Sequence, residues 1–146
     1  MEFQGFNCRI CGGRLVPKLN EVVCSNCNFI QHPVKENDIG INSDSLKRKM
    51  DKKEDFVILD VREKWEYDMS NIKNSILIPL RDLKNGIKNI DKNKEIIVIC
   101  HLGERSRYAA RFLIQNGFKN VKNLEGGINS LSRIDNSVRI YWIWIK

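Results

Sequence analysis

Apolar and polar positions follow two different periods along the chain after about residue 44. Short runs of β-branched and other apolar residues predict strands at residues 56–59, 76–79, 96–99 and 121–124. Stretches with apolar residues on one helical face predict helices at residues 44–52, 63–68, 80–87, 106–116 and 127–133. Ser43 or Asp44 is placed to cap the first helix. Strands alternating with helices predict an α/β fold, with a parallel sheet covered by helices on both faces.

The N-terminal part has no such pattern and instead contains two C-x2-C pairs, formed by Cys8, Cys11, Cys24 and Cys27. Each pair can present two thiolates to one metal ion, and Gly12-Gly13 allows the sharp turn that this needs. Residues 14–17 and 21–23 predict two short strands. So short a segment cannot fold on apolar burial alone, whereas structural zinc supplies about 10–16 kcal/mol in small peptides. We therefore predict a zinc ribbon over residues 1–36, with rubredoxin-like iron and a redox-active dithiol as alternatives.

Three further parts of the chain lie outside the predicted ribbon strands and the α/β pattern. Residues 37–43 are mostly polar and contain a glycine, which suits a linker between residues 1–36 and a domain at 44–146. His32 lies close to Cys27, but four thiolates already complete a tetrahedral shell, so we expect a surface or packing role for it. Residues 138–145 are strongly apolar, and we expect them to be buried against the domain or the ribbon of the same chain, with burial across a dimer as the alternative.

The composition indicates where the protein resides and shows that its charge is unevenly distributed along the chain. With 42% apolar and 29% charged residues, no leader-like start and no membrane-length apolar run, we expect a soluble cytoplasmic protein without a membrane partner. The net charge is +7, but residues 1–40 hold four basic and four acidic side chains, so the excess lies on residues 41–146. This excess either attracts anionic partners or forms a solvated lysine-rich surface. Because the ribbon has no basic excess, we do not expect it to bind nucleic acid.

The fifth cysteine, Cys100, stands between the strand at 96–99 and the helix that follows. A turn from strand to helix leaves backbone N–H groups unpaired, with the positive end of the helix dipole behind them. These features and the nearby Arg105 favour the thiolate and predict a nucleophilic cysteine. Asp60 also follows a predicted strand, and the carboxyl ends of parallel strands meet at one edge of a sheet. We therefore expect Asp60 and Cys100 to share one site.

The residues around Cys100 resemble a known family. Cys100-His101-Leu102-Gly103-Glu104-Arg105-Ser106 resembles the active-site loop of the rhodanese superfamily, Cys-x-x-Gly-x-Arg followed by Ser or Thr. Residues 56–67 resemble the family's strand with its Asp-Val-Arg motif, and residues 117–128 resemble its Gly-Phe and Leu-x-Gly-Gly signature. One departure is the segment 70–76, where the family usually has Gly-His-Ile-x-Gly-Ala; we expect it to affect local turn geometry rather than chemistry.

The resemblance implies a rhodanese-like domain and a sulfurtransferase activity. Cys100 would accept a sulfane sulfur from thiosulfate or a persulfidated protein and pass it to a thiophilic acceptor. Backbone amides of residues 101–106, which include Leu102 and Glu104, would form an anion-binding nest around that sulfur, and Gly103 would let the loop curl closely around it. Arg105 would hold an anionic donor through its paired N–H groups, and Ser106 would cap the following helix.

The roles of the other matched residues have alternatives. Asp60 and Arg62 would brace the loop and the strand, or would form only a peripheral ion pair. His101 would exchange a proton with the substrate or point at solvent. A phosphatase would carry Cys-x5-Arg, whereas four residues separate Cys100 from Arg105, so the smaller loop suits one sulfur atom. The main alternative to an enzyme is a non-catalytic module that binds or regulates another protein.

Overall fold

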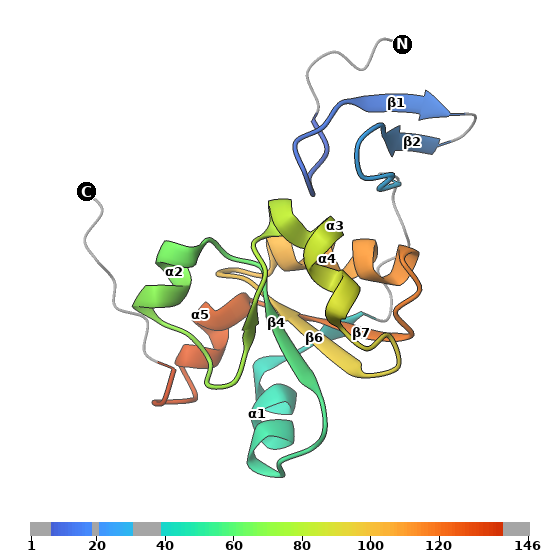
Figure 1. The fold of residues 1–146 in the computed structure, drawn as a ribbon. Helices are drawn as coiled ribbons and strands as arrows, with labels where there is room; N and C mark the ends of the chain where they lie inside the picture. The colour runs from blue at the N-terminus through green and yellow to red at the C-terminus, as the bar shows by residue number, and fades with distance from the viewer. Residues whose placement is uncertain (1–6, 19–20, 31–38, 139–146) are drawn as a thin grey trace, which may run out of the picture.

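The computed structural model describes residues 7–18, 21–30 and 39–138. Two predictions fall outside these ranges: the surface or packing role of His32 and the burial of residues 139–145. The described chain folds as one five-stranded sheet with helices and, ahead of it, a small two-stranded unit that holds four cysteines (Figure 1). We call this unit, residues 7–18 and 21–30, the cysteine module.

All neighbouring strands of the large sheet are parallel, in the order β3-β7-β6-β4-β5. Their bounds are β3 Gly40–Ile41, β4 Val57–Asp60, β5 Ile76–Leu77, β6 Glu95–Ile99 and β7 Asn120–Leu124. Asp60 pairs with Ile99, which confirms that the carboxyl ends of β4 and β6 lie side by side. Cys100 directly follows β6 and therefore lies at this edge of the sheet.

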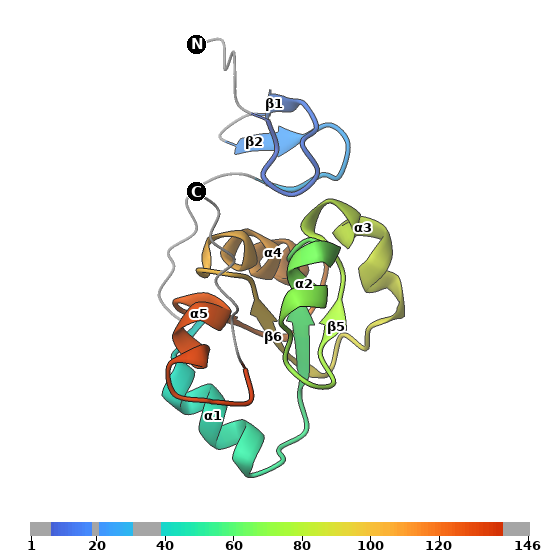
Figure 2. The same cartoon turned by 90° about the vertical axis from the view of Figure 1, so that its left-hand side faces the viewer.

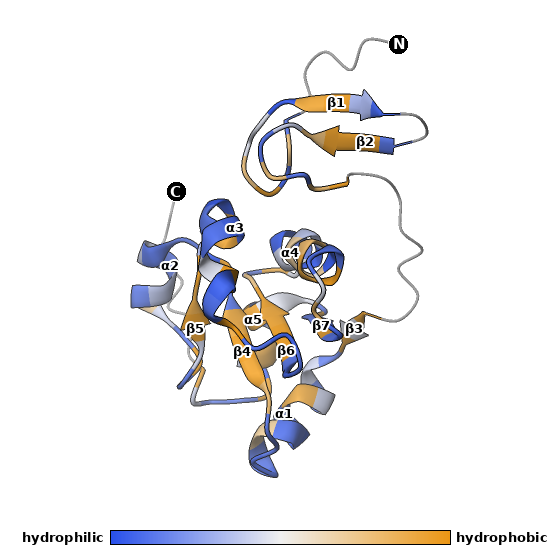
Figure 3. Ribbon diagram, turned by 45° about the vertical axis from the view of Figure 1, so that its right-hand side comes forward, coloured by the Kyte–Doolittle hydropathy of each residue, from blue (hydrophilic) through white to orange (hydrophobic). Residues whose placement is uncertain are grey.

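Helices cover both faces of the sheet, as the sequence predicted. Their bounds are α1 Ser43–Asp51, α2 Lys64–Met69, α3 Leu83–Gly86, α4 Glu104–Gln115 and α5 Gly127–Ser132, with 3-10 turns η1 Leu80–Asp82 and η2 Ile87–Asn89 on either side of α3. The central strands are the most apolar part of the molecule (Figure 3). In β6, Ile96 and Val98 face the cluster beneath α3 and α4, whereas Ile97 and Ile99 face the cluster beneath α1 and α5. The parallel α/β fold class is therefore confirmed.

Two details near the start of this domain differ from the sequence prediction. Residues 40–41 fall in the predicted linker but form β3, because their backbones pair with Asn123 and Leu124 of β7. The N-cap of α1 is Asn42, whose Oδ1 accepts the backbone N–H of Ser45 at 2.8 Å, rather than Ser43 or Asp44. The segment between the cysteine module and the domain therefore ends in sheet structure.

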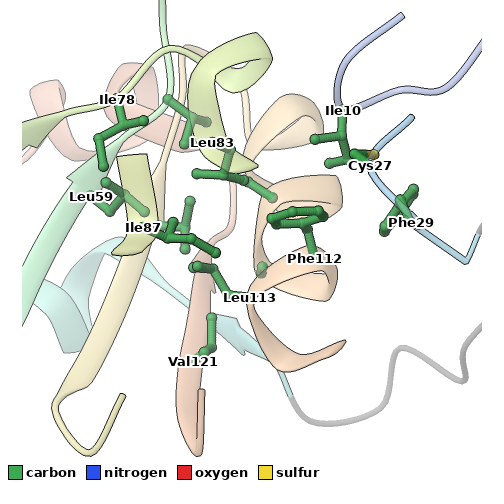
Figure 4. Close-up of a cluster of buried hydrophobic side chains, with 14 of the residues drawn as sticks. Ile10, Cys27, Phe29, Leu59, Ile78, Leu83, Ile87, Phe112, Leu113 and Val121 are labelled. Carbon is green, nitrogen blue, oxygen red and sulfur yellow. The ribbon is translucent and has the colours of Figure 1, made fainter. Parts of the chain in front are cut away.

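The cysteine module is an antiparallel hairpin of β1 Leu15–Lys18 and β2 Glu21–Cys24. It lies on the side of α3 and α4 in both views of the fold (Figure 1, Figure 2). Its buried side chains and those of α4 form one apolar cluster, in which Ile10, Cys27 and Phe29 lie near Phe112 (Figure 4). The rings of Phe29 and Phe112 have centroids 6.3 Å apart.

Polar contacts complete this junction. The side-chain amide of Gln115 accepts the N–H of Ile30 at 3.0 Å and donates to its carbonyl at 3.1 Å. The ammonium group of Lys84 donates to the carbonyl of Asn26 at 2.8 Å. Helix α4 therefore contacts both the sheet and the cysteine module, and Gln115 makes its contact with Ile30 at the exposed end of the helix.

Candidate active site and cysteine cluster

The Cys100 thiol lies in a closed turn between β6 and α4, with the residue only 1% exposed. The N–H of Gly103 donates to Sγ at 3.0 Å, and the Ser106 hydroxyl lies 3.3 Å from the same sulfur. Gly103 has a φ of +94°, a conformation that residues with a side chain rarely adopt. The turn therefore directs a backbone donor at the sulfur.

Helix α5 and the glycines before it fix the other side of this turn. The N–H of Ile128 donates to the Cys100 carbonyl at 2.8 Å, and that of Asn129 donates to the His101 carbonyl at 3.1 Å. A Cβ on Gly127 would overlap the His101 carbonyl, so only glycine allows this approach. The Leu-x-Gly-Gly segment thus has a structural task, which is to hold the carbonyls of the cysteine turn.

Ser106 has a different role from the predicted one. Gly103, not Ser106, is the N-cap of α4. The buried Ser106 hydroxyl instead bridges Cys100 Sγ and the Asn123 side chain, to whose Oδ1 it donates. Asn123 also donates from Nδ2 to the Gly103 carbonyl at 3.2 Å. Sequence reasoning missed Asn123, although strand alternation places this polar residue on the same face as the apolar Val121, which was a usable signal.

Arg105 forms a bidentate ion pair with Glu66 of α2. Its two terminal nitrogens donate to Glu66 Oε2 at 2.8 Å and Oε1 at 2.7 Å. Glu66 Oε2 also accepts the N–H of Glu63 at 2.8 Å, as the second half of the capping box that begins α2. Burial raises the pKa of Glu66, but hydrogen bonds from Arg105 and from the Glu63 amide outweigh it and hold the pKa below its usual value. Glu66 in turn raises the pKa of Arg105.

Sequence reasoning did not find Glu66. The spacing of Glu63 and Glu66 indicates a capping box, but it does not indicate a partner 39 residues along the chain.

Asp60 and Arg62 form a buried pair next to this site. Arg62 donates to Asp60 from its Nε and from a terminal nitrogen, the latter at 2.8 Å to Oδ2. It also donates to the carbonyls of Ser70 at 2.6 Å and Glu66 at 3.4 Å. These contacts connect the end of β4 to α2, which carries the partner of Arg105. Asp60 therefore lies at the predicted edge of the sheet, and Arg62 links it to Glu66 of α2 and to Ser70, which follows α2.

The remaining predicted positions of the loop lie toward the surface. Leu102 is 60% exposed, Glu104 is exposed and His101 is half-buried. Leu102 and Glu104 stand on either side of Gly103, whose amide points inward to the sulfur. The loop thus presents its backbone to Cys100 and several of its side chains to the outside.

The four cysteines of the cysteine module converge on one point, with their Sγ atoms within 4.8 Å of one another. The Sγ atoms of Cys8 and Cys27 lie 3.6 Å apart, and those of Cys11 and Cys24 lie 3.5 Å apart. Zinc–sulfur bonds of about 2.3 Å in a tetrahedron place two sulfurs about 3.8 Å apart, close to these separations. The donor set and its geometry therefore fit a tetrahedral metal ion.

Backbone amides and a tight glycine support the cluster. The N–H groups of Ile10, Gly13 and Asn26 each donate to a cysteine sulfur at 3.4 Å. A Cβ on Gly13 would lie 3.1 Å from Cys24 Sγ and 3.2 Å from Cys11 Sγ, so a side chain there would press against the sulfurs. Burial raises the pKa of Cys27. For Cys11, hydrogen bonds from the Asn26 side chain and the Gly13 amide outweigh burial and lower the pKa to about 7.

The fold and the site together define a class. A parallel sheet with helices on both faces, and a cysteine in a Cys-x-x-Gly-x-Arg turn after its central strand, is a rhodanese-like arrangement. The family model for the rhodanese-like domain matches residues 42–134, and the chain belongs to this family.

Curated relatives include proteins named for sulfur transfer. The putative sulfur carrier protein YrkF of Bacillus subtilis is 40% identical over 88 residues, which cover 60% of this chain and 48% of YrkF. The putative sulfurtransferase YtwF of the same organism is 35% identical over 88 residues, covering 60% of this chain and 84% of YtwF. The thiosulfate sulfurtransferase GlpE of Coxiella burnetii is 35% identical over 79 residues, covering 54% and 74%. The match to YrkF thus spans about half of that relative's length.

Solved structures agree with this assignment. A rhodanese-related protein from Thermoplasma volcanium superposes with a TM-score of 0.61 at 35% identity, covering 70% of this chain and 98% of that protein. A rhodanese-like domain protein from Staphylococcus aureus gives a TM-score of 0.63 at 30% identity, with coverages of 70% and 97%. Within the described part of the chain, no helix has the length and apolar character needed to cross a membrane.

Proposed function

We propose that the protein is a rhodanese-type sulfurtransferase that carries sulfane sulfur as a persulfide on Cys100. One observation supports this most directly: the Cys100 Sγ faces the Gly103 amide at 3.0 Å inside a turn held by α4 and α5. A backbone donor at that place stabilises negative charge on sulfur without occupying the space of a side chain. The names of the relatives support the same class of reaction.

The proposed reaction has two balanced steps. The Cys100 thiolate attacks the sulfane sulfur of thiosulfate, and the bond between the two thiosulfate sulfurs breaks, with its electron pair leaving on sulfite. With a persulfide donor, the same attack releases the donor's thiolate. A thiophilic acceptor then attacks the terminal sulfur of the Cys100 persulfide, and the electron pair of that bond returns to Cys100. No external oxidant or reductant is needed.

Residues around Cys100 take the supporting roles in this proposal. The amides of the loop 101–106 form the nest around the transferred sulfur, and that of Gly103 already donates to Cys100 Sγ. Arg105 is the group that would hold the sulfonate of an anionic donor. Asp60 and Arg62 position α2, and His101 exchanges protons with donor or acceptor. Substrate-binding roles for the exposed Leu102 and Glu104, and for Ser106 beside the sulfur, belong to the same proposal.

The cysteine module is proposed to be a structural zinc ribbon. Four thiolates would complete the zinc shell, and the ion would stabilise a unit whose own apolar core is small. A cytoplasmic setting would keep these thiols reduced and available for the metal. We propose that the module faces protein rather than nucleic acid, and that a protein donor or acceptor of sulfur reaches Cys100 without a membrane being involved.

Intact-protein mass spectrometry tests the proposal. After incubation with thiosulfate or glutathione persulfide, the protein should gain about 32 Da, the mass of one sulfur, and should lose it on treatment with cyanide. Cys100→Ser should show no gain, although its four other cysteines remain. If neither donor adds sulfur while Cys100 still reacts with an alkylating reagent, the carrier function is wrong and the non-catalytic binding module becomes the better account.

A further inference from the structure

The Glu66 side chain is largely buried beside the site and is held there by hydrogen bonds. Its side chain is 13% exposed, whereas that of Arg105 is 37% exposed. Both carboxylate oxygens accept from Arg105, and one of them also accepts the Glu63 amide that caps α2. The Glu66 carbonyl in turn accepts from the buried Arg62. These contacts fix the carboxylate in place, so Arg105 meets a preformed partner.

This pairing occupies the face of Arg105 that an anionic donor needs. A guanidinium binds a carboxylate or an oxyanion through the same parallel pair of N–H groups. A sulfonate that uses the two terminal nitrogens must displace Glu66, and one that approaches the Nε edge meets a guanidinium whose charge Glu66 already neutralises. Displacement would leave a largely buried carboxylate without its counter-charge, which is unfavourable. Thiosulfate would also meet the negative charge of Glu66 beside the Cys100 thiolate.

A persulfide donor does not have this difficulty. Its transferable sulfur is bonded to a divalent sulfur of the donor, and it has no sulfonate that requires an arginine. The donor needs only to bring its terminal sulfur to Cys100 and the Gly103 amide, and it leaves the pair of Arg105 and Glu66 undisturbed.

We propose that Glu66 is a specificity-determining residue that neutralises Arg105 and biases Cys100 toward persulfide donors and against thiosulfate. This inference rests on the proposed sulfur-carrier function. It assigns to Glu66 a role in donor choice, and it predicts that removing one carboxylate makes thiosulfate a better substrate.

The test compares Glu66→Gln with the unaltered full-length protein, using thiosulfate and glutathione persulfide as donors and the rate of Cys100 loading as the readout. Glutamine keeps the shape and can still accept the Glu63 amide, so α2 retains its capping box. The ratio of kcat/KM for thiosulfate to kcat/KM for the persulfide should rise about tenfold, or about 1.4 kcal/mol. A purely structural role of Glu66 would change both donors together.

Asp68→Asn is the matched control. Asp68 lies on the same helix and loses the same charge, but it pairs with the exposed Lys64 instead of Arg105. Its donor ratio should stay within about twofold of the unaltered protein, because exposed pairs are weak and screened. If Asp68→Asn raised this ratio as much as Glu66→Gln, the effect would come from net charge alone and the proposal would be overturned.

A double-mutant cycle with Arg105→Gln separates the pairing from other effects. In that background Glu66→Gln should change the donor ratio by less than about twofold, because the partner that it modulates is absent. An unchanged or lowered ratio in the single variant Glu66→Gln would refute the role of Glu66 while leaving the carrier function intact. Failure of both donors to load the unaltered protein would refute the carrier function itself and this inference with it.

Discussion

Replacing Phe29 by alanine should destabilise the whole domain, not only the cysteine module. Phe29 is 1% exposed and its ring lies 6.3 Å from that of Phe112, measured between centroids. Phe112 is itself 1% exposed and belongs to the cluster that packs beneath α4 on the sheet. Deleting a fully buried phenylalanine side chain costs about 3–5 kcal/mol through lost transfer energy and the cavity that remains. We expect a loss near the lower end, about 3 kcal/mol, because the module can shift toward α4.

Urea unfolding followed by far-ultraviolet circular dichroism measures this loss, with zinc in excess so that metal binding is the same in all samples. The transition should remain single and move to lower urea, because the module and the sheet share one apolar cluster. Val16→Ala is a matched control in the same module, since Val16 is only half-buried on β1. It should cost about 1 kcal/mol or less.

Two results would refute the reasoning. A loss below about 1 kcal/mol would mean that the ring contributes little to the domain, contrary to its burial. Two separate transitions would mean that the cysteine module unfolds independently of α4. Combining Phe29→Ala with Phe112→Ala should give a coupling energy of about 0.5–1.5 kcal/mol, as found for aromatic pairs.

Four further outcomes are expected. Cys24→Ser should release the metal, seen as lost zinc by elemental analysis, and should lower Tm; an unchanged zinc content would contradict the four-cysteine site. Gly127→Ala should slow sulfur loading at least about tenfold in the mass-spectrometric assay, because the new methyl overlaps the His101 carbonyl and φ is +64°; a normal rate would show that the turn tolerates the shift. Arg105→Ala should raise KM for thiosulfate more than KM for a persulfide, because it removes the N–H groups that would hold a sulfonate, and equal changes would deny Arg105 a role with anions. Although burial opposes it, hydrogen bonds from Arg105 and the Glu63 amide hold the pKa of Glu66 below its usual 4.5. The ionised carboxylate therefore contributes stability above that pH, and this contribution is lost as the pH falls below it. On acidification the urea midpoint of Glu66→Gln should consequently fall less than that of the unaltered protein.

The positions of the strands, helices and reactive turn were predictable because local chemistry decides them. Four β-branched residues in a row at 96–99 specify a buried strand whatever surrounds them, and Gly103 marks the turn by the backbone conformation that it permits. The spacing of two C-x2-C pairs likewise follows from the geometry that one tetrahedral ion requires. Such signals lie within a few residues of one another, so a linear sequence contains them.

Contacts between distant elements were decided by the tertiary structure. Arg105 meets Glu66 across 39 residues, and Ile30 meets Gln115 across 85, so neither pair leaves a local pattern. The two-residue strand β3 exists because β7 offers it a free edge, and Phe112 of α4 shares its apolar cluster with Phe29 because the cysteine module packs there. Apart from β3, the sequence by itself determined where the strands of the large sheet lie and where the nucleophile stands. Packing decided which charges and surfaces face that nucleophile, because the orientation of one element against another depends on the whole core rather than on neighbours in the chain.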